Sequence, residues 1–523
     1  MSKELDLGRV VGKDATINGQ NTINIVAGSN IDIQQQDGTL TIGVDNTHFN
    51  DKSNPHEVTA DQVGAVPVSR TVNGKPLSEN ISLNAADVGA SPTGHSHADK
   101  QDKLTGTPDQ YVTFDENGNA VAKQKDYSLF GFQINRDESD PSKIIKYIAQ
   151  NASYDPAFMD YEKDEFNYGD WADAWFIKGI KVVLLNNNGT IDTELNPNDY
   201  TKKINSNTIM NIENPFTNVM VGIPTVWVRY TVLNGKDTFY FSDQKLSDNF
   251  YTYAHTAADG SIMPYTYLAA YNGWKDSNGK LRSVSGKTPT VADSATAEIT
   301  AAKANNPTGK NMWDIDVLAD RNLINLLLLL IGKSTDTQTT FGNGRITTST
   351  DSDDTYRNKA IPTGTMNDKG LFWGSNADNL GVKVFGIEHW WGNMQRRTQG
   401  LILDNGVYKI KMTYGTEDGS TVEGYNTTGE GYIDTGLSPS KFLGYFITSM
   451  HVKKIALLPS EVSGSSTTYF CDEQYSVSDG KQISQFGGGI SGPSSGAGAF
   501  ACRLTSSINP STNCGACISC KPY

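Results

Sequence analysis

Hydrophobic and polar residues alternate near the start of the chain. Between residues 22 and 44, apolar side chains occupy every second position in short runs, a period typical of β-strands with one buried face. The dipeptide Asp37-Gly38 separates the last two runs, and similar dipeptides stand at 73–74 and 117–118. Such dipeptides favour tight hairpin turns because their residues adopt positive φ easily. The pattern predicts a succession of short β-hairpins.

These hairpins have too few apolar side chains to bury a core of their own. A phrase at residues 59–65 returns in altered form at 84–90, which indicates a short repeat. Thin, repetitive β-structure can bury its apolar faces against further copies of the same chain. We therefore expect residues 1–127 to form a fibrous, β-rich, homo-oligomeric stalk.

Aromatic residues become frequent after residue 127, which predicts a globular core there. Segments rich in β-branched and aromatic residues predict strands at 180–185, 219–231 and 239–241. The globular part is therefore expected to begin with a β-rich lead-in domain at 128–245.

Two segments further along have helical character. One is the alanine-rich stretch 292–304, and the other is 316–331, which contains an unbroken leucine run and is followed by Gly332 as a stop signal. The leucine run is far shorter than the roughly 20 residues that span a bilayer, so it predicts a buried core helix and no membrane insertion. The expected fold class is α+β, with a second globular domain at 246–523.

Composition and charge narrow the functional classes. The 523 residues include 50 glycines and 23 tyrosines but only 20% charged residues, which favours a turn-rich β protein. The formal charge of −14 would repel a phosphate backbone, so no nucleic-acid partner is expected. The first residues are charged and contain no apolar segment, so we expect no secretion signal and synthesis in the cytoplasm.

All of the cysteines lie in the C-terminal part: Cys471, Cys502, Cys514, Cys517 and Cys520. An odd number in a chain made in a reducing compartment argues against a disulfide framework, so we expect thiols. Cys502 is expected to pack as a small hydrophobic residue. The last three have the Cys-x2-Cys spacing of zinc ligands, but a fourth ligand at a suitable spacing is missing, so packing is favoured over zinc.

Three phrases in the N-terminal part, at 54–59, 72–77 and 94–97, resemble the shaft segments of tailed-phage fibres. Those fibres are trimers, so the resemblance implies a homotrimer in the phage tail of the virion, attached through its N-terminus to tail or baseplate proteins. In such fibres His-x-His pairs bind a metal on the three-fold axis. His95 and His97 would bring six imidazoles together, a set that suits octahedral iron or another transition metal. A solvated polar linker is the alternative.

Four phrases in the C-terminal part point to a second family. They are 281–286 with Pro289, 313–344, 386–393, and Gly487-Gly488 followed by 515–517. In this order they resemble the formylglycine-generating-enzyme-like branch of the C-type lectin fold, as found in phage proteins that diversity-generating retroelements mutate. The resemblance implies a C-type-lectin-like, receptor-binding domain at 246–523.

The residues that carry chemistry in that family are replaced here. Its oxidases need two cysteines spaced Cys-x4-Cys after the Gly-Gly pair, and Gly492 and Ala497 stand at those positions, so we expect no enzyme and no required cofactor. The tryptophans at 390–391 are expected in the core. In several members the asparagine that corresponds to Asn393 holds calcium together with a nearby glutamate. An arginine replaces that glutamate here and would repel a cation, which argues against calcium at Asn393.

Residues 487–520 form a segment of unusual composition, which we call the C-terminal segment. Its 34 residues contain no Lys, Glu, Gln, Trp or Met, although all five occur elsewhere. In the retroelement systems that the chain resembles, adenine-directed mutagenesis cannot generate those five types. The absence of these five residue types favours a diversified recognition surface, and an ordinary Gly/Ser-rich loop is the alternative.

Binding residues of proteins lie disproportionately on loops that a rigid scaffold presents. If the stretch 499–507 is extended, its odd-numbered residues face outward, and Phe500, Cys502 and Leu504 point into the core. The expected receptor-binding residues are Gly489, Ile490, Ser491, Gly492, Ser494, Ser495, Ala499, Ala501, Arg503, Thr505, Ser507 and Asn509.

Together these features predict a tail-fibre protein that attaches a phage to a glycan or protein receptor on the host surface. Three copies would add avidity. One alternative is a fibre-borne glycan depolymerase, which needs paired carboxylates such as those among Asp351, Asp353, Asp354, Asp160 and Glu162. Another is a variable lectin displayed on a bacterial surface, which a secretion signal would favour.

Overall fold

The computed structural model divides the chain into two compact units, Met1–Lys125 and Asp126–Tyr523. The described residues are 15–18, 22–25, 31–36, 39–44, 71–72, 74–76, 80, 82, 110–114, 116–124 and 127–523, apart from 215, 347–359, 378, 440–443, 477–479, 490–495, 506–508 and 511–512. The border between the units lies close to the expected end of the stalk. Strands greatly outnumber helices, which confirms a β-rich α+β structure.

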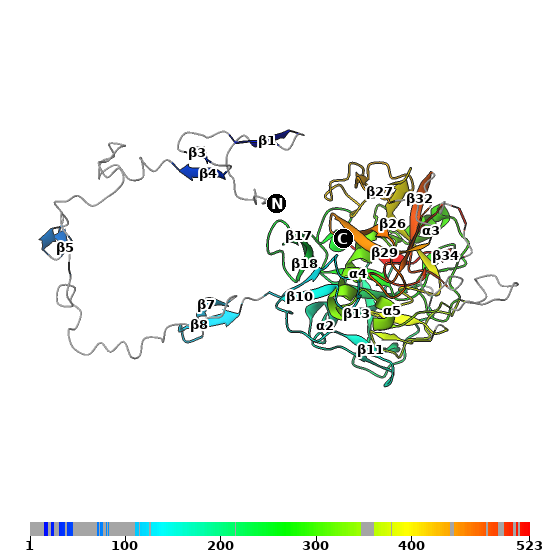
Figure 1. Cartoon of the computed structure of the whole chain (residues 1–523). Helices are drawn as coiled ribbons and strands as arrows, with labels where there is room; N and C mark the ends of the chain where they lie inside the picture. The colour runs from blue at the N-terminus through cyan, green and yellow to red at the C-terminus, as the bar shows by residue number, and fades with distance from the viewer. Residues whose placement is uncertain are drawn as a thin grey trace. The chain divides into compact units, whose positions relative to one another are not determined.

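In its described part, the N-terminal unit consists of separate antiparallel hairpins (Figure 1). The pairs are β1 (Ala15–Asn18) with β2 (Thr22–Ile25), β3 (Ile31–Gln36) with β4 (Thr39–Val44), β5 (Thr71–Val72) with β6 (Lys75–Pro76), and β7 (Gln110–Phe114) with β8 (Ala120–Gln124). The strands on either side of the three dipeptides are therefore paired as predicted, and Gly74 and Gly118 have φ of 76° and 78°. On β7, Val112 and Phe114 are 58% and 72% exposed. His95 and His97 lie outside the described residues.

A seven-stranded sheet in the second unit has the order β15-β14-β13-β16-β19-β35-β22. Its strands are β13 (Lys181–Leu185), β14 (Ile191–Asn196), β15 (Asp199–Lys203), β16 (Asn218–Pro224), β19 (Tyr265–Ala269), β22 (Trp313–Ile315) and β35 (Ile518–Cys520). β13 confirms the strand expected at 180–185. Because β35 pairs with both β19 and β22, the end of the chain is an interior strand of this sheet.

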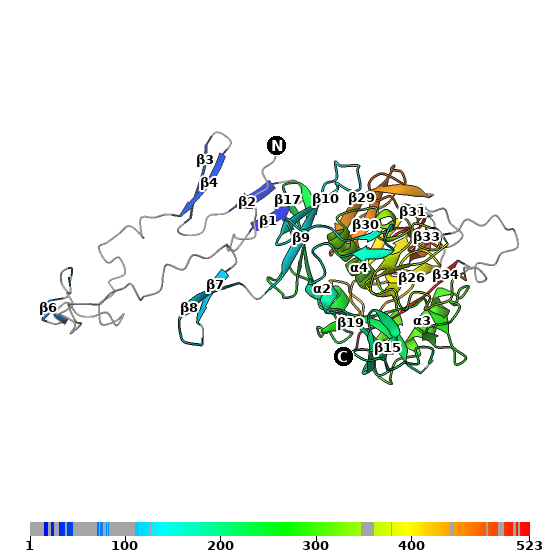
Figure 2. The same cartoon turned by 90° about the horizontal axis from the view of Figure 1, so that it is seen from below.

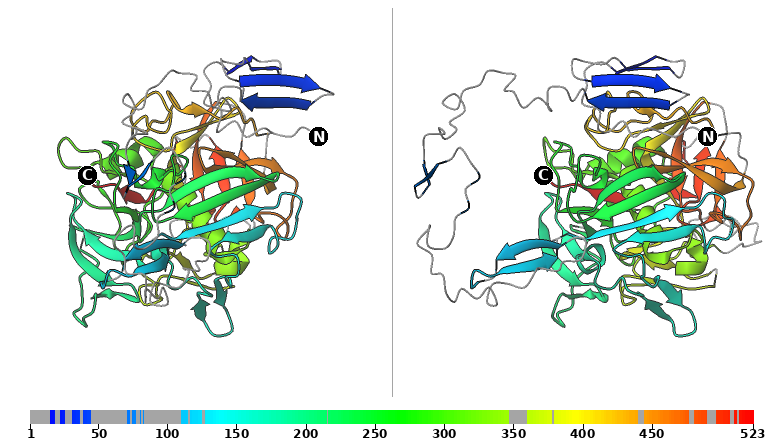
Figure 3. Two further views of the ribbon diagram at one scale, coloured as in Figure 1. Left: turned by 90° about the vertical axis from the view of Figure 1, so that its left-hand side faces the viewer. Right: turned by 60° about the vertical axis from the view of Figure 1, so that its left-hand side comes forward.

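A four-stranded antiparallel sheet follows the order β10-β9-β18-β17, seen as neighbouring cyan and green arrows in Figure 3. Its strands are β9 (Leu129–Ile134), β10 (Ile145–Ala149), β17 (Trp227–Leu233) and β18 (Lys236–Ser242). The strand expected at 239–241 is confirmed within β18. The single strand expected at 219–231 is wrong, because the chain leaves the seven-stranded sheet at Pro224 and re-enters this one as β17. Proline cannot donate a hydrogen bond to a neighbouring strand, which fits a strand end.

The largest sheet has nine strands in the order β28-β27-β26-β32-β33-β31-β29-β30, and β34 pairs with β26. They are β26 (Gln395–Asp404), β27 (Val407–Ile410), β28 (Ile433–Asp434), β29 (Tyr445–Lys453), β30 (Ala456–Val462), β31 (Glu473–Ser476), β32 (Lys481–Phe486), β33 (Cys502–Thr505) and β34 (Cys514–Gly515). Smaller sheets pair β11 (Phe158–Asp160) with β12 (Glu165–Asn167), β20 (Trp274–Lys275) with β21 (Leu281–Arg282), and β24 (Val382–Val384) with β23 (Trp373–Gly374) and β25 (Ile387–Glu388).

Both expected helices are present. Helix α3 (Ala295–Lys303) begins after Ser294, whose hydroxyl accepts a hydrogen bond from the Ala297 amide. Helix α4 (Leu318–Gly332) is buried along its whole length and lies between the seven-stranded and nine-stranded sheets (Figures 1 and 2). The leucine run is thus a core helix, as predicted. Shorter helices are α2 (Trp175–Lys178), α5 (Thr337–Phe341) and the 3-10 turn η4 (Tyr253–His255).

The role predicted for Gly332 is wrong. Gly332 is the last residue of α4, and Lys333 takes the left-handed conformation that ends the helix, with φ of 51°. A Cβ atom at Gly332 would lie 2.8 Å from Cζ of Phe341 on α5. Glycine is therefore needed here for the close packing of α5 against α4, because any larger side chain would push the Phe341 ring away.

The two globular regions expected at 128–245 and 246–523 lie within one compact unit. Strands from both sides of residue 245 share the seven-stranded sheet, where β16 pairs with β19, and one hydrophobic cluster contains side chains from Phe130 to Leu504. The expected boundary is absent because non-local strand pairing joins the two regions. The described part of the chain contains no helix with the length and apolar character needed to cross a bilayer.

Candidate functional site

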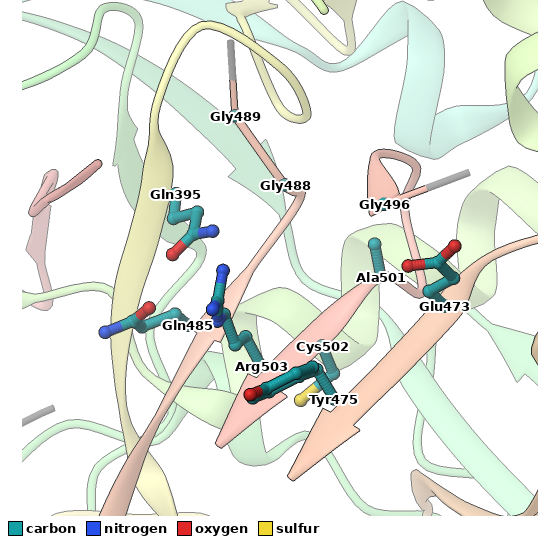
Figure 4. A pocket seen from close by; sticks show the side chains of 10 residues that line it. All are labelled: Gln395, Glu473, Tyr475, Gln485, Gly488, Gly489, Gly496, Ala501, Cys502 and Arg503. Carbon is teal, nitrogen blue, oxygen red and sulfur yellow. The ribbon is translucent and has the colours of Figure 1, made fainter. Parts of the chain in front are cut away.

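A cavity of about 200 Å³ opens over β31, β32 and β33 of the nine-stranded sheet, and we call it the β33 cavity (Figure 4). Its lining combines one cationic group, one anionic group, two amides, one aromatic ring and several small residues. The lining residues are Gln395, Glu473, Tyr475, Gln485, Gly488, Gly489, Gly496, Ala501, Cys502 and Arg503. The C-terminal segment supplies its glycine, alanine, cysteine and arginine, while β26, β31 and β32 supply the rest.

Strand register explains why three of the larger side chains meet. β33 runs parallel to β31, with Arg503 opposite Tyr475, and antiparallel to β32, with Arg503 opposite Gln485. Residues opposite each other on neighbouring strands share a face of the sheet. The Arg503 guanidinium lies 4.5 Å from the centre of the Tyr475 ring, within the range of a cation–π contact.

Several polar groups of the β33 cavity lack protein partners. Gln485 is 2% exposed and Gln395 is 9% exposed, yet within the described residues neither side-chain amide forms a hydrogen bond. In the same described part, the Arg503 guanidinium has no ion pair or hydrogen bond beyond its contact with Tyr475. Buried polar groups in proteins are normally hydrogen-bonded. Donors and acceptors are therefore available to a polar ligand.

Main-chain contacts hold the C-terminal segment in place where it approaches the cavity. The Ala499 carbonyl accepts hydrogen bonds from Asn325 Nδ2 at 2.7 Å and from Arg321 Nη2 at 3.3 Å. The Ala499 amide donates to Thr337 Oγ1 at 3.1 Å, and the Phe500 amide donates to Asp472 Oδ2 at 2.8 Å. The side chains in these bonds all belong to the scaffold. The path of the segment therefore depends little on its own side chains.

A layer of buried charged side chains, which we call the buried charged layer, lies beneath these main-chain contacts. Arg321 and Arg396 lie 4.2 and 4.6 Å from the Trp390 ring centre, and Arg396 pairs with Asp316 at 2.8 Å. Burial lowers the pKa of Arg321 to about 9 and raises the pKa of Asp316. Burial also raises the pKa of the Asp472 carboxyl well above its usual range. Such buried groups hold fixed positions because displacing them would leave charges unpaired.

The structure brings three of the predicted site residues to the cavity: Gly489, Ala501 and Arg503. The outward orientation expected for Ala499 is wrong, since Ala499 is fully buried, and Ala501 is 2% exposed and faces only the cavity. Residues 499–501 precede β33, which begins at Cys502, so the strand alternation expected from residue 499 onward does not apply to them. Phe500, Cys502 and Leu504 are buried as predicted.

The other predicted site residues are only partly described. Asn509 is exposed, and it does not line the β33 cavity. Thr505 is the last residue of β33, and its side chain is outside the described part. The remaining predicted residues lie outside the described residues: Ile490, Ser491, Gly492, Ser494, Ser495 and Ser507.

Sequence reasoning missed seven lining residues: Gln395, Glu473, Tyr475, Gln485, Gly488, Gly496 and Cys502. Gln485 stands just before the Gly487-Gly488 phrase, in a strand-like stretch, and that proximity was a usable signal. Tyr475 reaches the cavity through the parallel pairing of β31 with β33, which no local pattern reveals.

The residues considered for metal binding have other partners. Asn393 is buried with φ of 60°, and its side chain accepts from the Ile361 amide at 2.8 Å and donates to Asn272 Oδ1 at 2.9 Å. Among the described residues, no group of three or more His, Cys, Asp or Glu side chains is arranged to hold a metal ion. All five cysteines are buried free thiols, and Cys502 packs in the hydrophobic core.

Among the carboxylates considered for hydrolysis, Asp160 and Glu162 do not line the β33 cavity. Asp160 pairs with Lys163 at 2.7 Å beside Glu162, and the hydrogen bond from Lys163 is the largest cause that lowers the Asp160 pKa. A general acid needs the opposite shift. Asp351, Asp353 and Asp354 lie outside the described residues.

The tryptophans at 390–391 belong to the buried core. Trp390 and Trp391 are fully buried, as predicted, and a Cβ atom at Gly392 would lie 2.6 Å from the Arg345 amide nitrogen.

In comparisons with known proteins, no family model and no curated protein matches the chain.

Proposed function

We propose that this protein is a phage tail-fibre protein that binds a receptor on the host surface through the β33 cavity and the C-terminal segment around it. The cavity is the observation that carries the proposal. It joins an aromatic ring, a guanidinium and two buried amides that lack partners in the described part of the chain. Groups of this kind recognise polar ligands such as sugars and peptide side chains.

The division of the cavity wall supports a diversified receptor site. Gln395, Glu473 and Gln485, of residue types that the C-terminal segment lacks, come from the scaffold, and the segment supplies small residues and Arg503. The segment is held through its main chain, so its side chains can change while its path is kept. We propose that the scaffold is a C-type-lectin-like fold and that mutagenesis acts on this segment.

The N-terminal unit would serve as a trimeric stalk that joins the tail or baseplate. Its described hairpins are two-stranded, and Val112 and Phe114 expose apolar surface on one strand of a hairpin. Two-stranded hairpins are marginally stable alone, so burial against other copies would stabilise them. His95 and His97 remain candidate ligands for iron or another transition metal on the trimer axis.

Adsorption to host cells tests this function. Labelled full-length protein should bind candidate host bacteria and compete with phage adsorption. Ala501→Tyr, which fills the cavity, should abolish binding, and Thr467→Tyr on an exposed turn should not. Equal binding by both variants would contradict the proposal. Release of reducing ends from host capsule would favour a depolymerase instead.

A further inference from the structure

We propose that the β33 cavity binds one acidic sugar residue, a ring bearing hydroxyl groups and a single carboxylate. This inference rests on the proposed receptor-binding function and specifies the ligand class of the same site. It follows from the size of the cavity, its unpartnered polar groups and the sign of its charges.

Size limits the ligand to one ring. The cavity measures about 200 Å³, whereas sites for drug-sized molecules have roughly 300–1,000 Å³. One monosaccharide residue suits this space, and an internal stretch of a polysaccharide does not. The ligand would therefore be a terminal or side-branch residue of a surface glycan.

The buried amides of the cavity favour a ligand that carries hydroxyl groups. Gln395 from β26 and Gln485 from β32 each carry an NH₂ donor and a carbonyl acceptor, and both residues line the cavity (Figure 4). A hydroxyl group donates one hydrogen bond and accepts others, so neighbouring ring hydroxyls can satisfy both ends of an amide. An apolar ligand would leave these groups unsatisfied at a cost.

Arg503 selects an anion. Its guanidinium lies over the Tyr475 ring, 4.5 Å from the ring centre, and the N–H donors on the edge of the group have no acceptor among the described residues. That edge matches a carboxylate through two parallel hydrogen bonds. Within the described residues no protein carboxylate forms an ion pair with Arg503, so the ligand would supply the counter-charge.

The surrounding charge favours a carboxylate over a phosphate. Glu473 lines the same cavity, and the whole chain has a formal charge of −14. A phosphate monoester carries a charge of about −1.5 to −2 near neutral pH and would be repelled more strongly than a singly charged carboxylate.

Ligand titrations of the full-length protein test the inference. Methyl glucuronoside and the methyl glycoside of N-acetylneuraminic acid serve as acidic probes, and methyl glucoside and glucose 6-phosphate serve as comparisons, with dissociation constants measured by NMR. At least one acidic probe should bind about tenfold or more tightly than methyl glucoside, because a hydrogen-bonded charge pair is lost with the neutral sugar.

Arginine variants show whether the charge acts at this site. Arg503→Gln should weaken binding of the acidic probe about ten- to a hundredfold, and Arg503→Lys should weaken it less. Arg229→Gln is the matched control, since Arg229 also lies over a tyrosine ring, Tyr240, at 5.8 Å but outside the cavity. Should Arg503→Gln fail to fold, as judged by circular dichroism, Tyr475→Leu removes the stacking partner and should weaken the same probe.

Three results would overturn the inference: no binding of either acidic probe, equal binding of methyl glucoside, or preference for glucose 6-phosphate. The adsorption assay separates this failure from that of the proposed function. Host cells that bind the protein but not its Ala501→Tyr variant, without any preference for acidic sugars, would refute the ligand class alone. Cells that bind both proteins equally would refute the function.

Discussion

The two units of this chain achieve stability in different ways. In the described part of the N-terminal unit, the strands form separate two-stranded hairpins, and Phe114 is 72% exposed. In the second unit, sheets of four, seven and nine strands surround a helix whose every residue is buried. A single chain therefore supplies the whole core of the second unit, whereas the hairpins would gain their core from neighbouring copies.

The difference is useful to a receptor-binding protein. A chain segment can tolerate changes in its side chains only if something else fixes its main chain. The second unit provides this support through buried scaffold groups such as Asn325 and Asp472, which hold the main chain of residues 499–500. As a proposed stalk, the N-terminal unit would have no such demand, so simple repeated hairpins would be sufficient there.

The largest expected effect is in the buried charged layer. Arg396→Ala leaves Asp316 buried and unpaired, and should lower the free energy of unfolding of the second unit by about 3–5 kcal/mol. The eight tryptophans all lie after residue 126, so tryptophan fluorescence during denaturant titration reports on this unit alone. As a control, Lys178→Ala removes an exposed pair with Asp173 and should cost about 1 kcal/mol or less. Equal effects would show that the charged layer does not stabilise the scaffold.

Acid should weaken the second unit through its buried histidines. Burial lowers the pKa of His255 and of His389 from 6.5 to about 3. Below pH 6.5 the unfolded chain binds these protons and the folded chain does not. Each buried histidine therefore lowers the free energy of unfolding as the pH falls from 6.5 toward 3, and it has no such effect above pH 6.5. For His389 the loss between pH 8 and pH 5 is about 2 kcal/mol.

His389→Phe isolates that contribution. Both ring nitrogens of His389 lack hydrogen-bond partners in the described structure, so the variant removes the titration without breaking a bond. The difference in unfolding free energy between pH 8 and pH 5 should shrink by about 2 kcal/mol relative to wild type. His56→Phe in the N-terminal unit should leave that difference unchanged. An unchanged pH dependence in His389→Phe would contradict the assignment.

A smaller effect on stability is expected at the cavity itself. Arg503 has no ion pair in the described part of the chain, so Arg503→Ala should change the free energy of unfolding by about 1 kcal/mol or less, mainly through the lost contact with Tyr475. Denaturant titration measures this change. A loss as large as that of Arg396→Ala would mean that Arg503 supports the fold and is not available to a ligand.

The smallest effect on the second unit should come from the stalk. Val112→Ser combined with Phe114→Ser removes exposed apolar groups, so the denaturation of the second unit should not change. Association of the copies should weaken, and sedimentation velocity should show smaller species at low concentration. Retention of the wild-type assembly would contradict burial of these side chains between copies.

The hairpins and core helices could be predicted from sequence because their signals are local. The Asp37-Gly38 dipeptide and its flanking alternation specify β3 and β4, and the leucine run specifies α4. Gly332 shows the limit of such reading. Its glycine is required by contact with Phe341 on another helix, and a sequence pattern cannot distinguish that need from a helix stop.

The candidate site could be predicted only in part. The composition of residues 487–520 and the alternation expected in an extended stretch at 499–507 directed attention to Gly489, Ala501 and Arg503, and the structure places all three at the cavity. The burial of Ala499 could not be foreseen, because it results from hydrogen bonds to α4 residues more than a hundred positions away.

The sequence by itself determined the hairpins flanking the turn dipeptides, helices α3 and α4, where the aromatic core begins and which segment avoids five residue types, since each depends on neighbouring residues alone. Tertiary structure decided that Tyr475 and Gln485 flank Arg503, that β35 lies inside the seven-stranded sheet, and that residues 128–245 share a core with the rest. Strand pairing between distant segments produces these features. The partners in such pairing are selected by how whole sheets pack, which no short stretch of sequence contains.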